Sequence, residues 1–142
     1  KIVILEYNPT FGSEIEVSIP NIKNFDRTKY HYSNLCFGMS LKAATKIMKK
    51  KNFYFLGSNL LKNNAFFISN KYKKELFFGS LNINKLEDST NSNFTESRDT
   101  NGNLNYLDSK KRINEISDCE VVDLSNSKNK IVKLKSLLST IN

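Results

Sequence analysis

The apolar positions of this chain fall into short runs, and the first of them begins at residue 2. Ile2 to Leu5 is continuous and rich in β-branched residues, and Glu6 and Asn8 follow directly. A run without polar alternation predicts a strand buried on both faces, as in a parallel sheet covered by helices. We therefore expect a central strand whose missing neighbours come from upstream sequence or another subunit. Its polar carboxyl end lies where open α/β sheets bind ligands.

A helix is predicted over residues 40–51. Ser40 is a suitable N-cap, and lysines in the last turn complement the helix dipole. The apolar positions recur at three- and four-residue spacing and form one stripe: Leu41, Ala44, Ile47 and Met48. Beyond the helix, Phe53–Leu56 and Ala65–Ile68 predict two strands. Because only a polar loop separates them, we expect an antiparallel hairpin.

A long connection precedes this helix. It contains a predicted short strand, Glu16–Ile19, and the polar, aromatic stretch from Phe25 to Tyr32. Connections of this length inside compact domains are usually functional. We therefore expect the rings of Tyr30, His31 and Tyr32 to lie near the carboxyl end of the first strand. A purely structural role for these rings is the alternative.

The character of the chain changes beyond Tyr72. Residues 81–105 are dominated by Asn, Ser, Thr, Asp and Glu, which is typical of a flexible or irregular linker. A short helix over 107–116, a short strand over 119–124 and an amphipathic helix over 130–138 are predicted after it. We expect two parts: residues 1–80 form the main domain, and residues 81–142 form a polar linker with a small C-terminal extension.

Composition narrows the partners. No stretch approaches the roughly 18 apolar residues that a transmembrane helix needs, and no signal peptide is visible, so we expect no membrane partner and a cytoplasmic location. A targeting signal in missing upstream sequence stays open. The formal charge of +8 permits nucleic-acid binding. The chain is rich in Lys, Asn, Ile and Phe together, a bias typical of AT-rich coding, which disfavours nucleic-acid binding.

The spacing of the two cysteines does not indicate a disulfide or a zinc site. Cys36 and Cys119 lie far apart in the sequence and belong to no CxxC motif or Cys/His cluster. The sequence therefore predicts neither a disulfide framework nor a zinc site, and a reducing compartment is the default.

Several short sequence motifs in the chain resemble those of a known family. They are Ile-Leu-Glu-Tyr-Asn-Pro-x-Phe-Gly at 4–12, Phe-Gly-x-Ser-Leu-Lys-Ala at 37–43, and Gly-x-Asn with Asn-Ala-Phe-Phe between 57 and 67. They resemble the C-terminal half of a bacterial family of class I methyltransferases that use S-adenosylmethionine, similar in the loose sense to FkbM-type methyltransferases. Glu96–Asp99 and Val122–Leu124 resemble the C-terminal extension of that family.

The resemblance implies a Rossmann-like α/β fold in which this chain supplies the C-terminal half of the sheet. Ile2–Tyr7 would be the fifth strand, 40–51 the last helix, Phe53–Leu56 the sixth strand, and Asn64–Ser69 a seventh strand inserted antiparallel by the hairpin. S-adenosylmethionine would be held by the missing N-terminal half. The chain has no GxGxxG turn, so we expect no cofactor on this part alone.

Methyl transfer is an in-line displacement, so the protein mainly aligns the reactants and, where needed, accepts a proton. No metal ion is required, and none is predicted. Glu6 is the expected base or substrate anchor, with His31 and Tyr32 as wall and donor. The expected substrate-binding residues are amides and guanidinium groups: Asn8, Asn59, Asn64, Arg98 and Arg112. For Asn59 and Asn64, turn formation is the alternative.

Three functions therefore stay open. The leading hypothesis is the C-terminal half of a methyltransferase that acts on a small molecule or a glycan, with this part lining the substrate side and inactive alone. A non-catalytic Rossmann-like binding module is the first alternative. A basic nucleic-acid-binding domain is the second.

Overall fold

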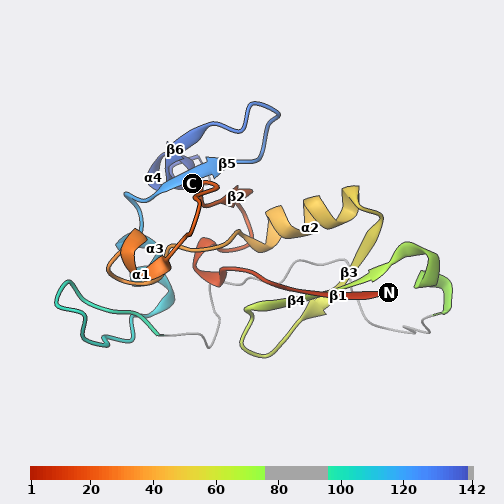
Figure 1. Cartoon of the computed structure of the whole chain (residues 1–142), viewed down its shortest axis with the longest axis horizontal. Helices are drawn as coiled ribbons and strands as arrows, with labels where there is room; N and C mark the ends of the chain where they lie inside the picture. The colour runs from red at the N-terminus through yellow and green to blue at the C-terminus, as the bar shows by residue number, and fades with distance from the viewer. Residues whose placement is uncertain (76–95, 141–142) are drawn as a thin grey trace.

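A computed structural model describes residues 1–75 and 96–140, without the side chains of residues 73–75. The chain is mixed α/β and forms two small antiparallel sheets, with helix α2 (Leu41–Lys50) between them in the view of Figure 1. Most of the predicted linker, and the predicted boundary at residues 80 and 81, lie outside the described residues.

The first sheet contains β1 (Ile2–Glu6), β3 (Phe53–Ser58) and β4 (Asn64–Ser69), in the order β1-β4-β3. β4 is antiparallel to both neighbours, so β1 and β3 run parallel to each other, and α2 lies in the connection between them. The predicted hairpin of β3 and β4 is confirmed. The 3₁₀ helix η2 (Asn70–Glu75) follows β4.

The prediction of a central first strand, buried on both faces within a parallel sheet, is wrong for the described chain. There β1 is hydrogen-bonded to β4 alone and forms an edge of an antiparallel sheet. Ile2 and Ile4 are 66% and 60% exposed, whereas Val3 and Leu5 pack against the core under α2. The described part of the chain places one helix on one face of β1, which leaves the outer face of this strand exposed.

Helix α2 begins at Ser40, as its sequence predicts. The Ser40 hydroxyl accepts from the Ala43 backbone N–H at 3.2 Å and donates to the Ile15 carbonyl at 2.7 Å. The same residue therefore caps the helix and binds the segment before β2 (Val17–Ser18). The apolar stripe of α2 and the first sheet share one core: Tyr7, Leu41, Ala44, Met48, Phe55, Ala65 and Phe67.

The second sheet has the order β2-β5-β6, with β5 at Glu120–Asp123 and β6 at Ile131–Lys133. The predicted strand over 119–124 is thereby confirmed. The predicted helix over 130–138 is wrong in its first part, because Ile131–Lys133 is a strand and α4 covers only Leu134–Leu138. The branched side chains of β6 suit pairing with Val121 and Val122, and this pairing prevails over the helical period.

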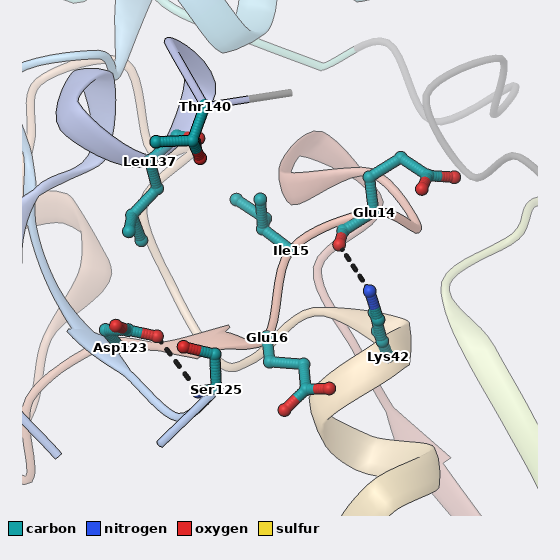
Figure 2. A pocket seen from close by; sticks show the side chains of 8 residues that line it. All are labelled: Glu14, Ile15, Glu16, Lys42, Asp123, Ser125, Leu137 and Thr140. Atoms are coloured by element: carbon teal, nitrogen blue, oxygen red, sulfur yellow. Dashed lines mark hydrogen bonds between the residues drawn. The ribbon is translucent and has the colours of Figure 1, made fainter. Parts of the chain in front are cut away.

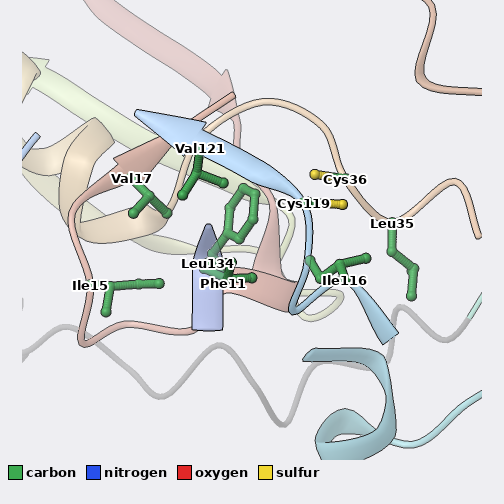
Figure 3. Packing of buried hydrophobic residues seen from close by; sticks show 9 residues of the cluster. All are labelled: Phe11, Ile15, Val17, Leu35, Cys36, Ile116, Cys119, Val121 and Leu134. Carbon is green, nitrogen blue, oxygen red and sulfur yellow. The ribbon is translucent and has the colours of Figure 1, made fainter. Parts of the chain in front are cut away.

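Three further short helices surround the second sheet: η1 (Pro9–Phe11), α1 (Arg27–Tyr30) and α3 (Ser109–Glu115), the last inside the predicted helix over 107–116. The buried residues of this second core come from both ends of the chain (Figure 3): Phe11, Ile15, Val17, Leu35, Cys36, Ile116, Cys119, Val121 and Leu134. Within the described ranges, no helix is long and apolar enough to cross a membrane.

The seam between α2 and the second sheet is polar. Lys46 forms an ion pair with Glu16 and also donates to the Leu124 carbonyl at 2.7 Å. Nearby, Lys42 donates to the Glu14 carbonyl at 2.7 Å. Both residues line a surface hollow together with Asp123 (Figure 2). The two lysines therefore attach α2 to the second sheet and its flanking loop.

Candidate functional site

The carboxyl end of β1 turns directly into a buried, capped corner. Tyr7, Asn8 and Pro9 are all buried, and the Asn8 carbonyl side-chain oxygen accepts from the Thr10 backbone N–H at 2.9 Å, which caps η1. The proline at the first helical position needs no N–H partner there. The Tyr7 hydroxyl donates to Ser58 Oγ at 3.1 Å, which joins this corner to the end of β3.

Asn8 also fixes the loop that precedes α2. Its side-chain N–H groups donate to the carbonyl oxygens of Leu35 at 2.6 Å and Phe37 at 2.9 Å, and its backbone N–H donates to Met39. Both ends of the buried Asn8 amide are therefore engaged within the protein. Its predicted substrate-binding role is untested, and its position is that of a structural clamp.

This clamp places two loops around Glu6 and forms a shallow, open hollow. The described residues that line it are Glu6, Phe25, Asp26, Arg27, Phe37 and Gly38. The Arg27 guanidinium lies over the Phe37 ring, with its central carbon 5.2 Å from the ring centroid. A carboxylate, a guanidinium and two aromatic rings thus surround one surface depression, a combination suited to an organic ligand with a polar edge.

Asp26 has a structural role in this hollow. Its carboxylate accepts from the Thr28 hydroxyl at 2.7 Å and from the Thr28 backbone N–H at 3.0 Å, and so caps α1. These hydrogen bonds lower the pKa of Asp26. The capped helix is what presents Arg27 to the hollow.

His31 and Tyr32 lie elsewhere, so the structure does not assemble the predicted catalytic trio. The two rings stack, with centroids 4.4 Å apart, and His31 Nδ1 is 2.7 Å from Ser33 Oγ. The Tyr32 hydroxyl donates to the Glu115 carboxylate at 2.5 Å, on α3. This hydrogen bond raises the pKa of Tyr32. Neither ring is among the described residues that line the Glu6 hollow.

Asn59 and Asn64 belong to the turn of the β3–β4 hairpin. The Asn59 side-chain carbonyl accepts from the backbone N–H groups of Asn63 and Asn64, both at 3.0 Å. The side-chain amide of Asn64 donates to Asn63 Oδ1 at 3.1 Å. These contacts favour turn formation over ligand binding for both residues.

The two predicted anion anchors also lie apart from Glu6. Arg98 donates from Nη1 to the Gly102 carbonyl at 2.7 Å and so closes its own turn. Arg112 is buried on α3, and burial lowers its pKa. Helix α3, which carries Arg112, packs against η1.

Of the described residues that line the hollow, only Glu6 was predicted as a site residue. The others were not predicted: Phe25, Asp26, Arg27, Phe37 and Gly38. Asp26 followed by Thr28 is a local capping signal that would have predicted α1 and hence the exposure of Arg27. Phe37 had no comparable local signal, because its place depends on the bond from Asn8.

The two cysteines are far apart in the sequence, but they lie together in the second core. The Cys36 thiol and the His31 side chain both lie close enough to Cys119 to influence the pKa of its thiol. Figure 3 shows the two sulfur atoms facing each other, and both thiols are free. Residues far apart in sequence thus meet because the loop before α2 packs beside the start of β5.

Within residues 1–75 and 96–140, no group of three or more His, Cys, Asp or Glu side chains could hold a metal ion. No family model, no curated protein and no solved structure matches the chain.

Proposed function

We propose that this chain is the C-terminal half of an S-adenosylmethionine-dependent class I methyltransferase domain. The observation that carries the proposal is the strand order β1-β4-β3. A last strand inserted antiparallel between two mutually parallel strands, with a helix in the crossover, is how the sheet of such a methyltransferase ends. The short sequence motifs that resemble this family lie in and around these same elements, β1, α2 and the β3–β4 hairpin.

The exposed edge of β1 supports the proposal that an N-terminal half of the same domain pairs with this strand. Ile2 and Ile4 present apolar side chains to solvent beside a strand edge that no other described strand covers. Such edges are normally covered or blunted. In the complete protein, we assign this edge to the N-terminal half of the same domain, which would carry the cofactor-binding turn.

The Glu6 hollow is then the part of the site that receives the methyl acceptor, a small molecule or a glycan. It lies at the carboxyl end of β1, the side on which open α/β sheets bind ligands. Glu6 is exposed, so its carboxylate is available to orient a hydroxyl or amine of the acceptor and take its proton. Phe25 and Phe37 form the apolar walls, and Arg27 suits an acidic group. S-adenosylmethionine supplies the methyl group when it is bound.

Calorimetric titration with S-adenosylmethionine tests this proposal. We expect the complete protein to bind the cofactor and the 142-residue chain not to bind it. In the complete protein, Glu6→Gln is expected to leave cofactor binding unchanged, because Glu6 is assigned to the acceptor side. Equal titrations of the two proteins, or no binding by either, would contradict the proposal and favour a non-catalytic binding module.

A further inference from the structure

The second core brings together two thiols from distant parts of the chain. Cys36 lies in the loop before α2, and Cys119 directly precedes β5. The two residues belong to the same buried core, and Figure 3 shows their sulfur atoms close together. Neither cysteine is among the described residues that line the Glu6 hollow.

Access to the two thiols is unequal. Cys36 is fully buried, whereas Cys119 is 7% exposed. Cys119 also lines a surface hollow together with Tyr30, His31, Asp118, Glu120 and Lys133. A small reagent that enters this hollow therefore meets Cys119 and not Cys36.

The surroundings also separate the two thiols electrostatically. The adjacent Cys36 thiol, the His31 side chain and the charge of Lys133 lower the pKa of Cys119, against the opposing effect of burial. The adjacent Cys119 thiol and burial raise the pKa of Cys36. Of the other groups at the hollow, Asp118 is ion-paired with Lys135 at 2.7 Å, Glu120 carries a negative charge, and Tyr30 has a pKa of about 12.

We propose that Cys119 and Cys36 are a reactive dithiol site that takes low-molecular-weight disulfides such as oxidised glutathione. Cys119 is the attacking thiol, because it is reachable, and Cys36 is the resolving thiol, because it is buried beside it. Attacking thiols are typically the accessible ones with thiolate character, with a resolving cysteine next to them. The assignment does not depend on the methyltransferase proposal.

The reaction has two balanced steps. The Cys119 thiolate attacks one sulfur of the small disulfide, which forms a mixed disulfide and releases one small thiolate. Cys36 then attacks Cys119 Sγ, which forms the Cys36–Cys119 bond and releases the second small thiolate. That thiolate takes up the proton that Cys36 loses, and the first released thiolate takes up from solvent the proton that Cys119 lost on ionisation. The protein dithiol is oxidised by two electrons, and the small disulfide is reduced to two thiols.

The loop that carries Cys36 also forms part of the Glu6 hollow. Cys36 lies between Leu35 and Phe37, whose carbonyl oxygens accept from Asn8. Phe37 lines the hollow. A bond from Cys36 to Cys119 therefore restrains the loop that forms one wall of that hollow.

The test uses the full chain, reduced and then treated with oxidised glutathione at neutral pH. Remaining thiols are alkylated, and peptides are mapped by mass spectrometry. We expect the native protein to lose both thiols together and to yield a linked Cys36–Cys119 peptide. In Cys36→Ala, the reaction is expected to stop at one glutathione on Cys119. In Cys119→Ala, Cys36 is expected to stay unmodified.

Two controls keep the test decisive if an alanine variant is unstable. Circular dichroism shows whether each variant is folded, and Lys133→Gln changes an exposed side chain without touching the core. In Lys133→Gln, we expect the pH midpoint of Cys119 modification to move upwards, because a favourable positive charge is lost. The proposal is overturned if the native protein keeps both thiols in excess oxidised glutathione. It is also overturned if folded Cys119→Ala is modified at Cys36 as fast as folded Cys36→Ala is modified at Cys119.

Discussion

The side-chain amide of Asn8 donates to the Leu35 carbonyl oxygen at 2.6 Å, which joins the end of β1 to the loop before α2. Asn8 is fully buried, so no water replaces this bond when it is broken. The same amide also reaches the Phe37 carbonyl at 2.9 Å. One small side chain thus holds together the corner that forms the Glu6 hollow.

Asn8→Asp is therefore expected to destabilise the protein by about 3 kcal/mol, because a buried carboxylate would face two carbonyl oxygens without a donor. Urea unfolding followed by circular dichroism measures the change in the free energy of unfolding. Asn21→Asp is the matched control, since Asn21 is exposed in a loop, and its effect is expected to stay within about 0.5 kcal/mol. Equal effects of the two substitutions would show that the clamp contributes little.

The attachment of α2 to the second sheet gives a second prediction. Lys46→Met removes the ion pair with Glu16 and the donor to the Leu124 carbonyl. The two charged side chains are 32% and 19% exposed, so water screens the pair in part, and we expect a loss of about 1–2 kcal/mol in the free energy of unfolding.

Lys29→Met is the control for Lys46→Met, because it breaks a pair with Asp26 in which the lysine is 85% exposed. Its cost is expected to be below about 0.5 kcal/mol. Both variants are measured by the same urea titration. A Lys46 variant no less stable than the Lys29 variant would mean that the seam does not depend on this lysine.

Sequence reasoning succeeded where the decisive interactions are local. Helix α2 is predicted by Ser40 as its N-cap and by apolar residues at three- and four-residue spacing. Both signals act within one or two helical turns. The β3–β4 hairpin follows from two apolar runs and the short polar loop between them. Each of these elements contains its own signal.

The failures arose where distant residues decide the structure. Ile131 pairs with Val122 rather than continuing a helix, and no local pattern specifies that partner. The apolar run from Ile2 to Leu5 correctly predicted a strand. It did not reveal how many faces of that strand the rest of the chain covers. Cys36, Cys119 and His31 meet only through tertiary packing, so their spacing in the sequence gave no indication of a cluster.

Tyr30 gives a prediction in the alkaline range. Its hydroxyl donates to the Glu120 carbonyl at 2.8 Å, and burial, with the nearby Cys36, Cys119 and Glu120, raises its pKa from 10.0 to about 12. Between these two values the unfolded chain has released the Tyr30 proton and the folded chain has kept it. Stability therefore falls as the pH rises through this interval.

Tyr30→Phe is expected to remove this part of the pH dependence, since phenylalanine has no proton to lose. It should also lower stability at neutral pH by about 1 kcal/mol, through the lost hydrogen bond to Glu120. Absorbance titration of tyrosinate and urea unfolding at several alkaline pH values measure the two effects. If Tyr30→Phe keeps the full loss of stability between pH 10 and about 12, the assignment is wrong.

The two faces of β1 provide the last prediction, which separates the chain from the complete protein. Val3 packs against the core under α2, and Ile4 is 60% exposed on the opposite face. In the 142-residue chain, Val3→Ser is expected to cost about 2 kcal/mol and Ile4→Ser less than about 0.5 kcal/mol. In the complete protein, where the proposed N-terminal half covers β1, Ile4→Ser should cost about 2 kcal/mol as well, because its side chain is then buried. Urea unfolding of both proteins measures the difference. A small effect of Ile4→Ser in both would show that the outer face of β1 stays in water and would remove the support that this edge gives to the methyltransferase proposal.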